Sequence, residues 1–395
     1  MKARFITFGC RLSRAEALDD EARFIADGWK TAESDAFADL FVVRGCSVTA
    51  RAQRECEKLI AGLKRKHPQA TVLVRGCIPG RTDDSFRPMP PDSAKTNALK
   101  GKDPLPLRTA RAYLKVQDGC SGNCTFCIVP KFRGKSESVP FDDLLERSKR
   151  FIDAGYREIV VTGCNLSLYA SQGKRLAELL AALAALDSGT RIRLGSLEPG
   201  ERAVETVHAI AENANICRFL HIPVQSGSER ILRAMQRPYT VESVGELVEL
   251  ASALIDDIAI GCDMMAGFPG ESQADFMESI KLIKRYRFTN AHVFPYSERP
   301  GTPAAAFPSP IPKDIRSARA KQLAEIAERE RKRFKRSFIG KQVEVLIEDE
   351  KKSAGWTSQY LWFERSRPQP ENSPKRRKIA AFTVSEVRNG VLRGS

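Results

Sequence analysis

The sequence has no hydrophobic run long enough to cross a membrane. Its longest apolar helical segment, Leu176–Leu186, has only about half of the roughly 20 apolar residues that a spanning helix needs. Residues 1–12 carry Lys2 and Arg4 and lack the small-residue cleavage site of a secretory signal. No internal repeat is long enough to suggest a solenoid. We therefore expect a cytoplasmic protein with no membrane partner.

Acidic residues are outnumbered by basic ones, with 49 Asp and Glu against 64 Lys and Arg and a formal net charge of +15. Basic side chains displace condensed counterions from phosphates, so nucleic acid is the expected partner. Residues 316–336 carry nine basic and three acidic residues, and residues 365–378 form a second basic patch. The alternatives are a soluble basic protein and a solvated helix face.

The first part of the chain alternates short apolar runs with amphipathic helical patterns. This alternation predicts a doubly wound parallel α/β domain at residues 1–95. The expected strands are residues 3–8, 40–43 and 71–74, and the expected helices are residues 14–26 and 49–66. Residues 81–107 are rich in proline and charge, so we interpret them as a linker.

Six further strand and helix units predict an incomplete (β/α)6 barrel at residues 106–338, whose chemistry collects at the carboxyl ends of the strands. The expected strands are residues 112–116, 158–162, 191–195, 219–223, 258–263 and 291–295, and a long amphipathic helix follows at residues 315–338. Residues 339–395 change to period-two runs at 342–347, 359–363 and 380–384. These runs predict a small antiparallel β-barrel.

Three of the ten cysteines, Cys120, Cys124 and Cys127, are spaced C-x3-C-x2-C directly after the first barrel strand. Cysteines in a reducing compartment are more readily ligands, catalytic groups or core residues than disulfides. Iron–sulfur clusters take soft thiolate ligands, and three cysteines leave one iron open for a substrate such as S-adenosylmethionine. The alternative is a zinc site, which usually has four protein ligands. We therefore expect a catalytic radical cluster on this loop.

A second set, Cys10, Cys46 and Cys77, places a Gly-Cys pair at the end of each expected strand in the first domain. The carboxyl ends of parallel strands converge on one crevice, so these cysteines could hold a second cluster with one open iron. The alternative is that all three are small core residues. We expect Cys56, Cys217 and Cys262 to be core residues, and Cys164 to be a possible cofactor contact.

These motifs resemble the radical S-adenosylmethionine methylthiotransferases over nearly the whole chain. The shared motifs are Thr7-Phe8-Gly9-Cys10, residues 46–49, Gly76-Cys77, residues 119–130, Arg133-Gly134 and residues 221–227, 267–271 and 294–302. The resemblance implies an amino-terminal methylthiotransferase domain, a radical barrel and a carboxyl-terminal RNA-binding TRAM barrel. It also implies two 4Fe-4S clusters, S-adenosylmethionine, tRNA as substrate, an electron donor such as flavodoxin or ferredoxin, and a sulfur donor.

Within this family, residues 10–16 and 293–297 are most similar to the subgroup that adds a methylthio group to C2 of N6-threonylcarbamoyladenosine at tRNA position 37. The near alternative is the subgroup that acts on isopentenyladenosine, and a third branch modifies a ribosomal protein aspartate. From other classes, the alternatives are a non-catalytic iron–sulfur RNA-binding protein and an electron-transfer protein.

The resemblance also implies that one S-adenosylmethionine methylates a sulfur at the second cluster, while another is cleaved at the first to generate the radical. Polar groups at the barrel strand ends are the expected cofactor contacts, with ordinary structural polarity as the alternative. These groups are Asn165, Glu198, Gln225, Ser226, Asp263 and Gly267. The target adenosine is expected to be flipped into the barrel mouth, with the tRNA phosphates on the basic surfaces.

Overall fold

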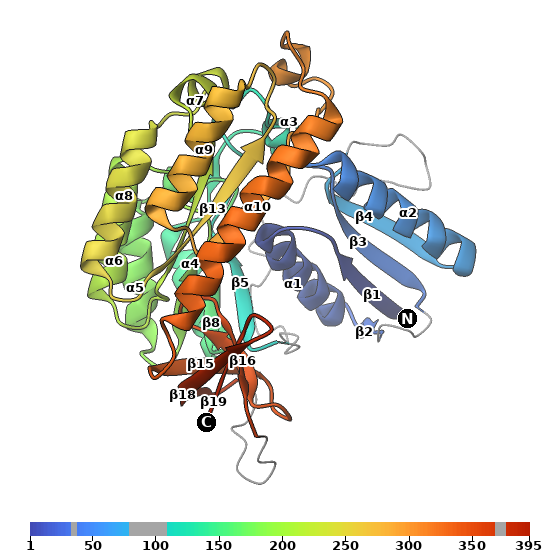
Figure 1. Ribbon diagram of the computed structural model, residues 1–395. Helices are drawn as coiled ribbons and strands as arrows, with labels where there is room; N and C mark the ends of the chain where they lie inside the picture. Colours follow the sequence, from blue (N-terminus) through green and yellow to red (C-terminus); the bar gives the residue numbers. More distant parts are fainter. Residues whose placement is uncertain (33–37, 79–108, 368–376) are drawn as a thin grey trace.

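The computed structural model describes residues 1–32, 38–78, 109–367 and 377–395. The predicted linker at residues 81–107 lies outside the described residues, and so does most of the basic patch at 365–378. Figure 1 shows an α/β part at the amino terminus beside a large strand–helix barrel, with a small β-barrel below it. Among the described residues, no helix is long and apolar enough to cross a membrane.

The amino-terminal part is a parallel sheet in the order β2-β1-β3-β4, as its apolar runs predicted. Its elements are β1 (Lys2–Thr7), α1 (Arg11–Ala26), β2 (Lys30–Thr31), β3 (Leu40–Cys46), α2 (Ala50–Lys66) and β4 (Thr71–Cys77). Thr49 caps α2 by accepting a hydrogen bond from the Ala52 amide. Strand β2 was not predicted, because two exposed polar residues carry no hydrophobic periodicity.

The central part has six parallel strands, which confirms the predicted incomplete barrel. They are β5 (Arg111–Lys115), β8 (Glu158–Thr162), β11 (Arg191–Leu194), β12 (Phe219–Gln225), β13 (Ala259–Ala266) and β14 (Asn290–Pro295). The sheets β5-β8-β11 and β12-β13-β14 are joined by two parallel bridges, Ile192 with Ile216 and Ser196 with His221. Two strands run further than predicted: β12 reaches Gln225, and β13 reaches Ala266.

Helices cover the outside of this barrel (Figure 1). They are α4 (Phe141–Asp153), α5 (Leu176–Leu186), α6 (Glu201–Glu212), α8 (Val241–Leu254), α9 (Gln273–Tyr286) and α10 (Lys313–Arg336). Shorter elements lie in the loops: β6 (Gln117–Asp118), α3 (Val129–Arg133), β7 (Glu137–Ser138), η1 (Leu166–Leu168), β9 (Ala170–Ser171), β10 (Lys174–Arg175), α7 (Glu229–Ala234) and η2 (Pro303–Ala306).

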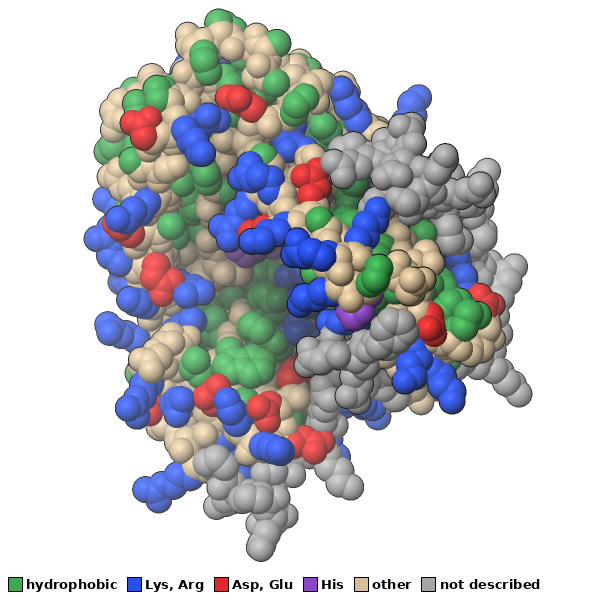
Figure 2. Space-filling model, turned by 90° about the vertical axis from the view of Figure 1, so that its right-hand side faces the viewer, with side chains coloured by type: hydrophobic (Ala, Val, Ile, Leu, Met, Phe, Trp, Pro, Cys, Tyr) green, Lys and Arg blue, Asp and Glu red, His purple; other side chains and the backbone are tan. Residues whose placement is uncertain are grey.

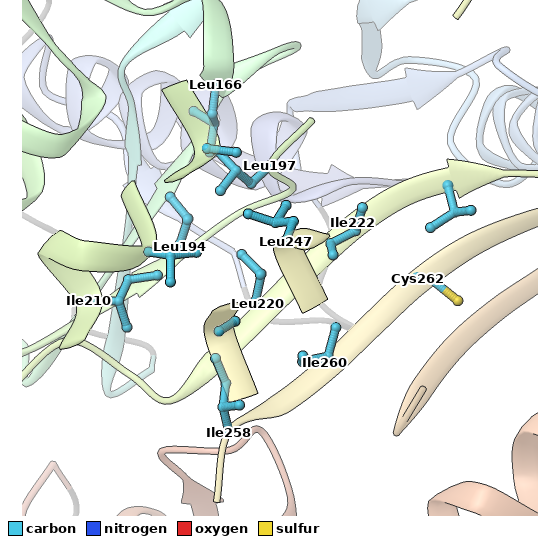
Figure 3. Packing of buried hydrophobic residues seen from close by; sticks show 14 of the residues in the cluster. Leu166, Leu194, Leu197, Ile210, Leu220, Ile222, Leu247, Ile258, Ile260 and Cys262 are labelled. Atoms are coloured by element: carbon cyan, nitrogen blue, oxygen red, sulfur yellow. The ribbon is translucent and has the colours of Figure 1, made fainter. Parts of the chain in front are cut away.

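Alternate residues of the barrel strands form the main hydrophobic core between strands and helices. Figure 3 shows Leu220 and Ile222 of β12 and Ile260 of β13 packed with Leu247 of α8. Cys262 is fully buried in the same core, as predicted. Because strand side chains alternate between faces, residues at the intervening positions, such as His221, face the barrel interior.

The carboxyl-terminal part is a closed five-strand barrel in the order β15-β16-β17-β19-β18, consistent with a TRAM-like domain. Its strands are β15 (Gln342–Asp349), β16 (Ala354–Thr357), β17 (Trp362–Arg365), β18 (Ile379–Arg388) and β19 (Val391–Gly394). Its core is built from Phe338, Val345, Ile347, Phe363 and Leu392. The predicted boundary at residue 339 falls in the turn between α10 and β15, while the domain limits 1–95, 106–338 and 339–395 stay a prediction.

A buried arginine of the large barrel, paired there with a glutamate, also donates hydrogen bonds to the small barrel. Arg193 of β11 donates to both carboxylate oxygens of Glu158 at 2.8 and 3.0 Å, and both side chains are inaccessible to solvent. The same guanidinium donates to the carbonyls of Thr357 and Ser358 at 3.0 and 3.1 Å. Arg193 therefore satisfies a buried acid and two backbone carbonyls of the small barrel at once.

Replacing Arg193 with Met should lower the free energy of unfolding by about 3–5 kcal/mol, because it leaves Glu158 charged, buried and unpaired. Urea unfolding followed by tryptophan fluorescence measures this loss. The matched control is Arg285→Met, which breaks an exposed pair with Glu249 and should change the free energy by less than about 1 kcal/mol. Equal losses in the two variants would contradict this account of the interface.

Candidate active site

The three cysteines of the predicted radical site lie on one compact loop between β6 and α3. A side chain at Gly122 would place its Cβ 3.3 Å from the Cys120 Sγ and 4.0 Å from the Cys124 Sγ, so both sulfurs lie next to this glycine. Burial, together with the nearby Cys124 and Cys120, raises the pKa of Cys127 to about 11. Metal binding stabilises the thiolate form, so three crowded thiols are suited to a cationic cluster.

The second cysteine set is brought together by strand register. Strands β3 and β4 pair Cys46 directly with Cys77. Gly9 has φ +98° beside them, and a Cβ there would lie 3.5 Å from the Cys46 Sγ. Burial raises the pKa of Cys77, and the neighbouring Cys10 and Cys46 also raise it. These contacts place the three cysteines together at the strand ends.

Arg133, at the end of α3, connects the two cysteine sets. Its Nε donates to the Cys77 Sγ at 2.9 Å, and its Nη1 donates to Glu16 at 2.7 Å and to Asp118 at 2.9 Å. Asp118 lies two residues before Cys120. Although burial opposes ionisation of Glu16, the Arg133 guanidinium and nearby cations lower its pKa to about 2. One guanidinium therefore contacts a ligand candidate of one set and the strand that leads to the other.

Arg133 was not predicted as a site residue. It appeared in the sequence only within the Arg133-Gly134 motif, and no local pattern linked it to Cys77, which lies 56 residues away. The signal in the sequence that could have identified Arg133 was its position as a basic residue shortly after a cysteine loop. Its role depends on how the amino-terminal sheet packs against the barrel, and sequence spacing does not encode that packing.

Two predicted cofactor contacts, Asn165 and Glu198, lie beside the radical loop. The Asn165 amide donates to Glu198 at 2.7 Å. Arg237 forms an ion pair with the other oxygen of Glu198 and donates to the Cys124 Sγ at 2.8 Å. Sequence reasoning missed Arg237, which follows α7 within a short polar turn. These side chains form a polar wall next to the cysteines, where the amino, carboxylate and ribose groups of S-adenosylmethionine could bind.

Gln225 and Ser226 end strand β12 inside the barrel. Gln225 has φ +69°, and its buried Oε1 has no hydrogen-bond partner among the described residues. The Ser226 hydroxyl accepts the Ser228 amide at 3.2 Å and is fully buried. A buried amide oxygen without a partner is costly, so Gln225 is suited to binding a polar ligand.

The last two predicted contacts, Asp263 and Gly267, differ in their surroundings. Asp263 lies within β13, and its Oδ1 contacts His221 Nε2 at 3.0 Å and His292 Nδ1 at 3.2 Å. Burial opposes its ionisation, but these hydrogen bonds hold its pKa well below the usual range. Gly267 has φ +76°, and its amide donates to Glu271 at 3.0 Å, so it forms the turn after the strand.

The remaining cysteines divide as predicted. Cys56 and Cys217 are buried together with Cys262. Cys164 follows β8 and lies 3.5 Å from the Asp118 carboxylate. Burial raises its pKa, and the nearby negative charge of Asp118 raises it further. Cys164 thus lies between the two cysteine sets as a neutral thiol.

The surface is hollowed between the amino-terminal part and the two barrels. Figure 2 shows hydrophobic side chains on the floor of this hollow and Lys and Arg side chains around it. Aromatic surfaces and basic groups are the features that bind unstacked bases and phosphates. The hollow therefore combines hydrophobic and basic side chains of the kind that bind nucleic acid.

Comparison with known proteins agrees with this geometry. Residues 114–283 match the Radical SAM superfamily. Residues 2–94 match a second family, described as Uncharacterized protein family UPF0004. These matches cover the radical cysteine loop and the second cysteine set, respectively.

Curated relatives match most of the chain. The threonylcarbamoyladenosine tRNA methylthiotransferase MtaB of Thermotoga maritima is 30% identical, over 87% of this chain and 86% of that protein. The tRNA-2-methylthio-N(6)-dimethylallyladenosine synthase of Chlorobium chlorochromatii is 32% identical, with the same coverage. The MtaB of Bacillus subtilis is 29% identical, over 90% of this chain and 88% of that protein.

A solved structure shares the fold at low sequence identity. The radical S-adenosylmethionine methyltransferase TsrM from Kitasatospora setae superposes with a TM-score of 0.55 at 13% identity and covers 77% of each chain. The sequence relatives extend this agreement to nearly the whole length. The chain therefore belongs to the radical S-adenosylmethionine methylthiotransferase family.

Proposed function

We propose that this enzyme adds a methylthio group to C2 of N6-threonylcarbamoyladenosine at position 37 of tRNA. The observation that carries the proposal is the placement of two cysteine triads at one interface, where Arg133 binds Cys77 of one triad and Asp118, two residues before the other. Three relatives with nearly full-length matches are named MtaB and act on threonylcarbamoyladenosine. The second candidate substrate is isopentenyladenosine, because a relative of similar identity is named for the dimethylallyl nucleoside.

The enzyme is a radical S-adenosylmethionine methylthiotransferase and uses 4Fe-4S clusters and S-adenosylmethionine. When bound, these groups supply two functions: a carbon radical that removes hydrogen from an unactivated C–H bond, and a carrier for the sulfur. We assign Cys120, Cys124 and Cys127 to the radical cluster. We assign Cys10, Cys46 and Cys77 to the auxiliary cluster, where Arg133 donates a hydrogen bond to Cys77.

Side chains of the barrel bind and orient the cofactor in this proposal. Glu198 and Asn165 form its polar contacts, and Arg237 holds Glu198 in place by an ion pair. The unpartnered Gln225 amide and the buried Ser226 hydroxyl provide further hydrogen-bonding groups. Asp263 stays ionised between two histidines, and Gly267 shapes the turn at the end of the same strand.

The tRNA partner binds through basic surfaces. On α10, the exposed basic side chains are Lys313, Lys321, Arg329, Lys332, Arg333 and Arg336. The last four lie in the half of the helix that leads to the small barrel, which we propose binds RNA. Phosphate contacts of this kind position the RNA without reading its sequence. We further propose a cytoplasmic location and an electron donor such as flavodoxin or ferredoxin.

Replacing Cys120 with Ala should abolish reductive cleavage of S-adenosylmethionine and leave about half of the bound iron, because only one cluster loses a ligand. Iron analysis and chromatography of 5′-deoxyadenosine measure these effects. Replacing Cys10 with Ala should also halve the iron but retain cofactor cleavage. The control Cys262→Ala, in the hydrophobic core, should keep both. Loss of all iron in the Cys120 variant would mean that the six cysteines form one shared site.

Deletion of the gene should remove the methylthio form of threonylcarbamoyladenosine from cellular tRNA, while threonylcarbamoyladenosine without the methylthio group accumulates. Mass spectrometry of tRNA nucleosides measures both species. A plasmid copy carrying Cys120→Ala should not restore the methylthio form, whereas one carrying Cys262→Ala should. Persistence of that form together with loss of methylthio-isopentenyladenosine would assign the enzyme to the second candidate substrate.

A further inference from the structure

At Arg11, all three parts of the molecule meet. Arg11 directly follows Cys10 at the start of α1, and its Nη1 donates to the Leu194 carbonyl of β11 at 3.1 Å. Its guanidinium carbon lies 6.0 Å from the ring centre of Phe219 and 5.3 Å from that of Tyr360. The Arg11 guanidinium, which belongs to the amino-terminal part, therefore contacts both the large barrel and the small barrel.

A continuous series of rings leads from the carboxyl-terminal half of the barrel interior to this arginine. The ring centres are separated by 5.0 Å between His292 and His221, 6.3 Å between His221 and Phe219, and 5.3 Å between Phe219 and Tyr360. Tyr360 then stacks on Trp356 at 4.6 Å. His292 is 60% exposed at one end of the series, and Tyr360 and Trp356 are partly exposed at the other.

Positive charge at the Tyr360 end is only partly neutralised. Three guanidiniums lie near the Tyr360 ring, and together they lower its pKa against the effect of burial. Arg193 is paired with Glu158, and Arg111 is paired with Glu348 at 2.9 Å. Arg11 has no acidic partner among the described residues, and its hydrogen bond to Leu194 uses one nitrogen. The remaining N–H groups of Arg11 can therefore donate hydrogen bonds to an anion.

We propose that Arg11 binds the carboxylate of the threonylcarbamoyl substituent and so determines which modified adenosine the enzyme accepts. The inference rests on the proposed function, since it deepens the choice of substrate at the same site. The threonyl carboxylate is the group that distinguishes this substituent from isopentenyl by charge. A planar guanidinium matches a carboxylate in a two-point, charge-assisted contact.

Specificity follows from the cost of leaving a charged group without a partner. An isopentenyl substituent would displace water from Arg11 and provide no hydrogen-bond acceptor, which disfavours its binding. The rings of Phe219 and Tyr360 hold the guanidinium at a fixed position. Because Arg11 adjoins Cys10, an anion bound there is also placed next to the auxiliary cysteine set.

The test compares dissociation constants of anticodon stem-loops on the reconstituted enzyme, without reductant so that no turnover occurs. The three RNAs carry threonylcarbamoyladenosine, its carboxyl methyl ester or isopentenyladenosine at the same position. The wild-type enzyme should bind the free acid about 10- to 100-fold more tightly than the ester, as expected for a hydrogen bond to a charged group. In the Arg11→Gln variant this ratio should fall to about one.

Two further variants make the comparison specific. Arg11→Lys keeps the charge and should retain part of the acid-to-ester ratio, whereas Arg23→Gln, in the last turn of the same helix, should keep all of it. Each ratio compares two RNAs on one protein, so a change in folding or cluster content cancels. Iron analysis confirms that the Arg11 variants retain the cluster next to Cys10.

The outcomes separate the inference from the function on which it rests. If the wild type prefers the acid and Arg11→Gln keeps the full preference, Arg11 is not the specificity residue, while the proposed function stands. If the wild-type enzyme binds acid and ester equally and prefers isopentenyladenosine, the proposed substrate is wrong, and the inference falls with it.

Discussion

The hydrogen bond from Arg133 to Cys77, together with the Arg133 contacts to Glu16 and Asp118, is the interaction on which the rest of the site depends. Each cysteine triad is assembled within its own part of the chain, by a loop in the barrel and by strand register in the sheet. Arg133 holds the two assemblies together. This contact lies between the two triads and, together with the other contacts of α1 with the barrel, fixes their relative position.

The buried charges around Arg133 also have partners of opposite charge. Glu16 and Asp20 accept hydrogen bonds from Arg44, and Glu16 also pairs with Lys115 of β5. Burying charge is tolerated when every member has partners. Here the network lies between the amino-terminal sheet and the barrel. Its directional contacts fix the orientation of the sheet relative to the barrel, which an apolar surface would not do.

The open side and one end of the incomplete barrel are covered by the other parts of the chain. On the inner face of the barrel, Tyr113 and Val160 pack against Ala15 of α1. At the other boundary, Arg193 and Tyr360 join the large barrel to the small one. The inner face of the large barrel, the cysteine loops and the ring of Tyr360 are therefore all close to the boundaries between the three parts.

Local sequence pattern was sufficient to predict the two cysteine triads and the six strands of the large barrel. The spacing of Cys120, Cys124 and Cys127 and the strand-end Gly-Cys pairs identified both triads, and apolar periodicity predicted the six barrel strands. The residues that connect the parts, Arg133 and Arg237, were missed, because their partners are 56 and 113 residues away. Their roles arise from docking, which periodicity and spacing do not describe.

Small errors in the predicted elements have a similar cause. Strand β13 continues to Ala266 because it pairs with β14 along that whole length. Asp263 therefore lies within the strand, between two histidines, and not at its end. Strand β2 has two residues and is defined only by its pairing with β1. In each case, pairing with a neighbouring strand extended or created an element that its own residues did not specify.

We propose that the two triads hold two clusters that face one another across the Arg133 interface. The most direct measurement is electron paramagnetic resonance of the fully reduced holoenzyme. Two neighbouring clusters should couple magnetically, seen as a broadened spectrum that simplifies when Cys10, Cys46 and Cys77 are all replaced by Ala. A wild-type spectrum equal to the sum of two isolated clusters would contradict it.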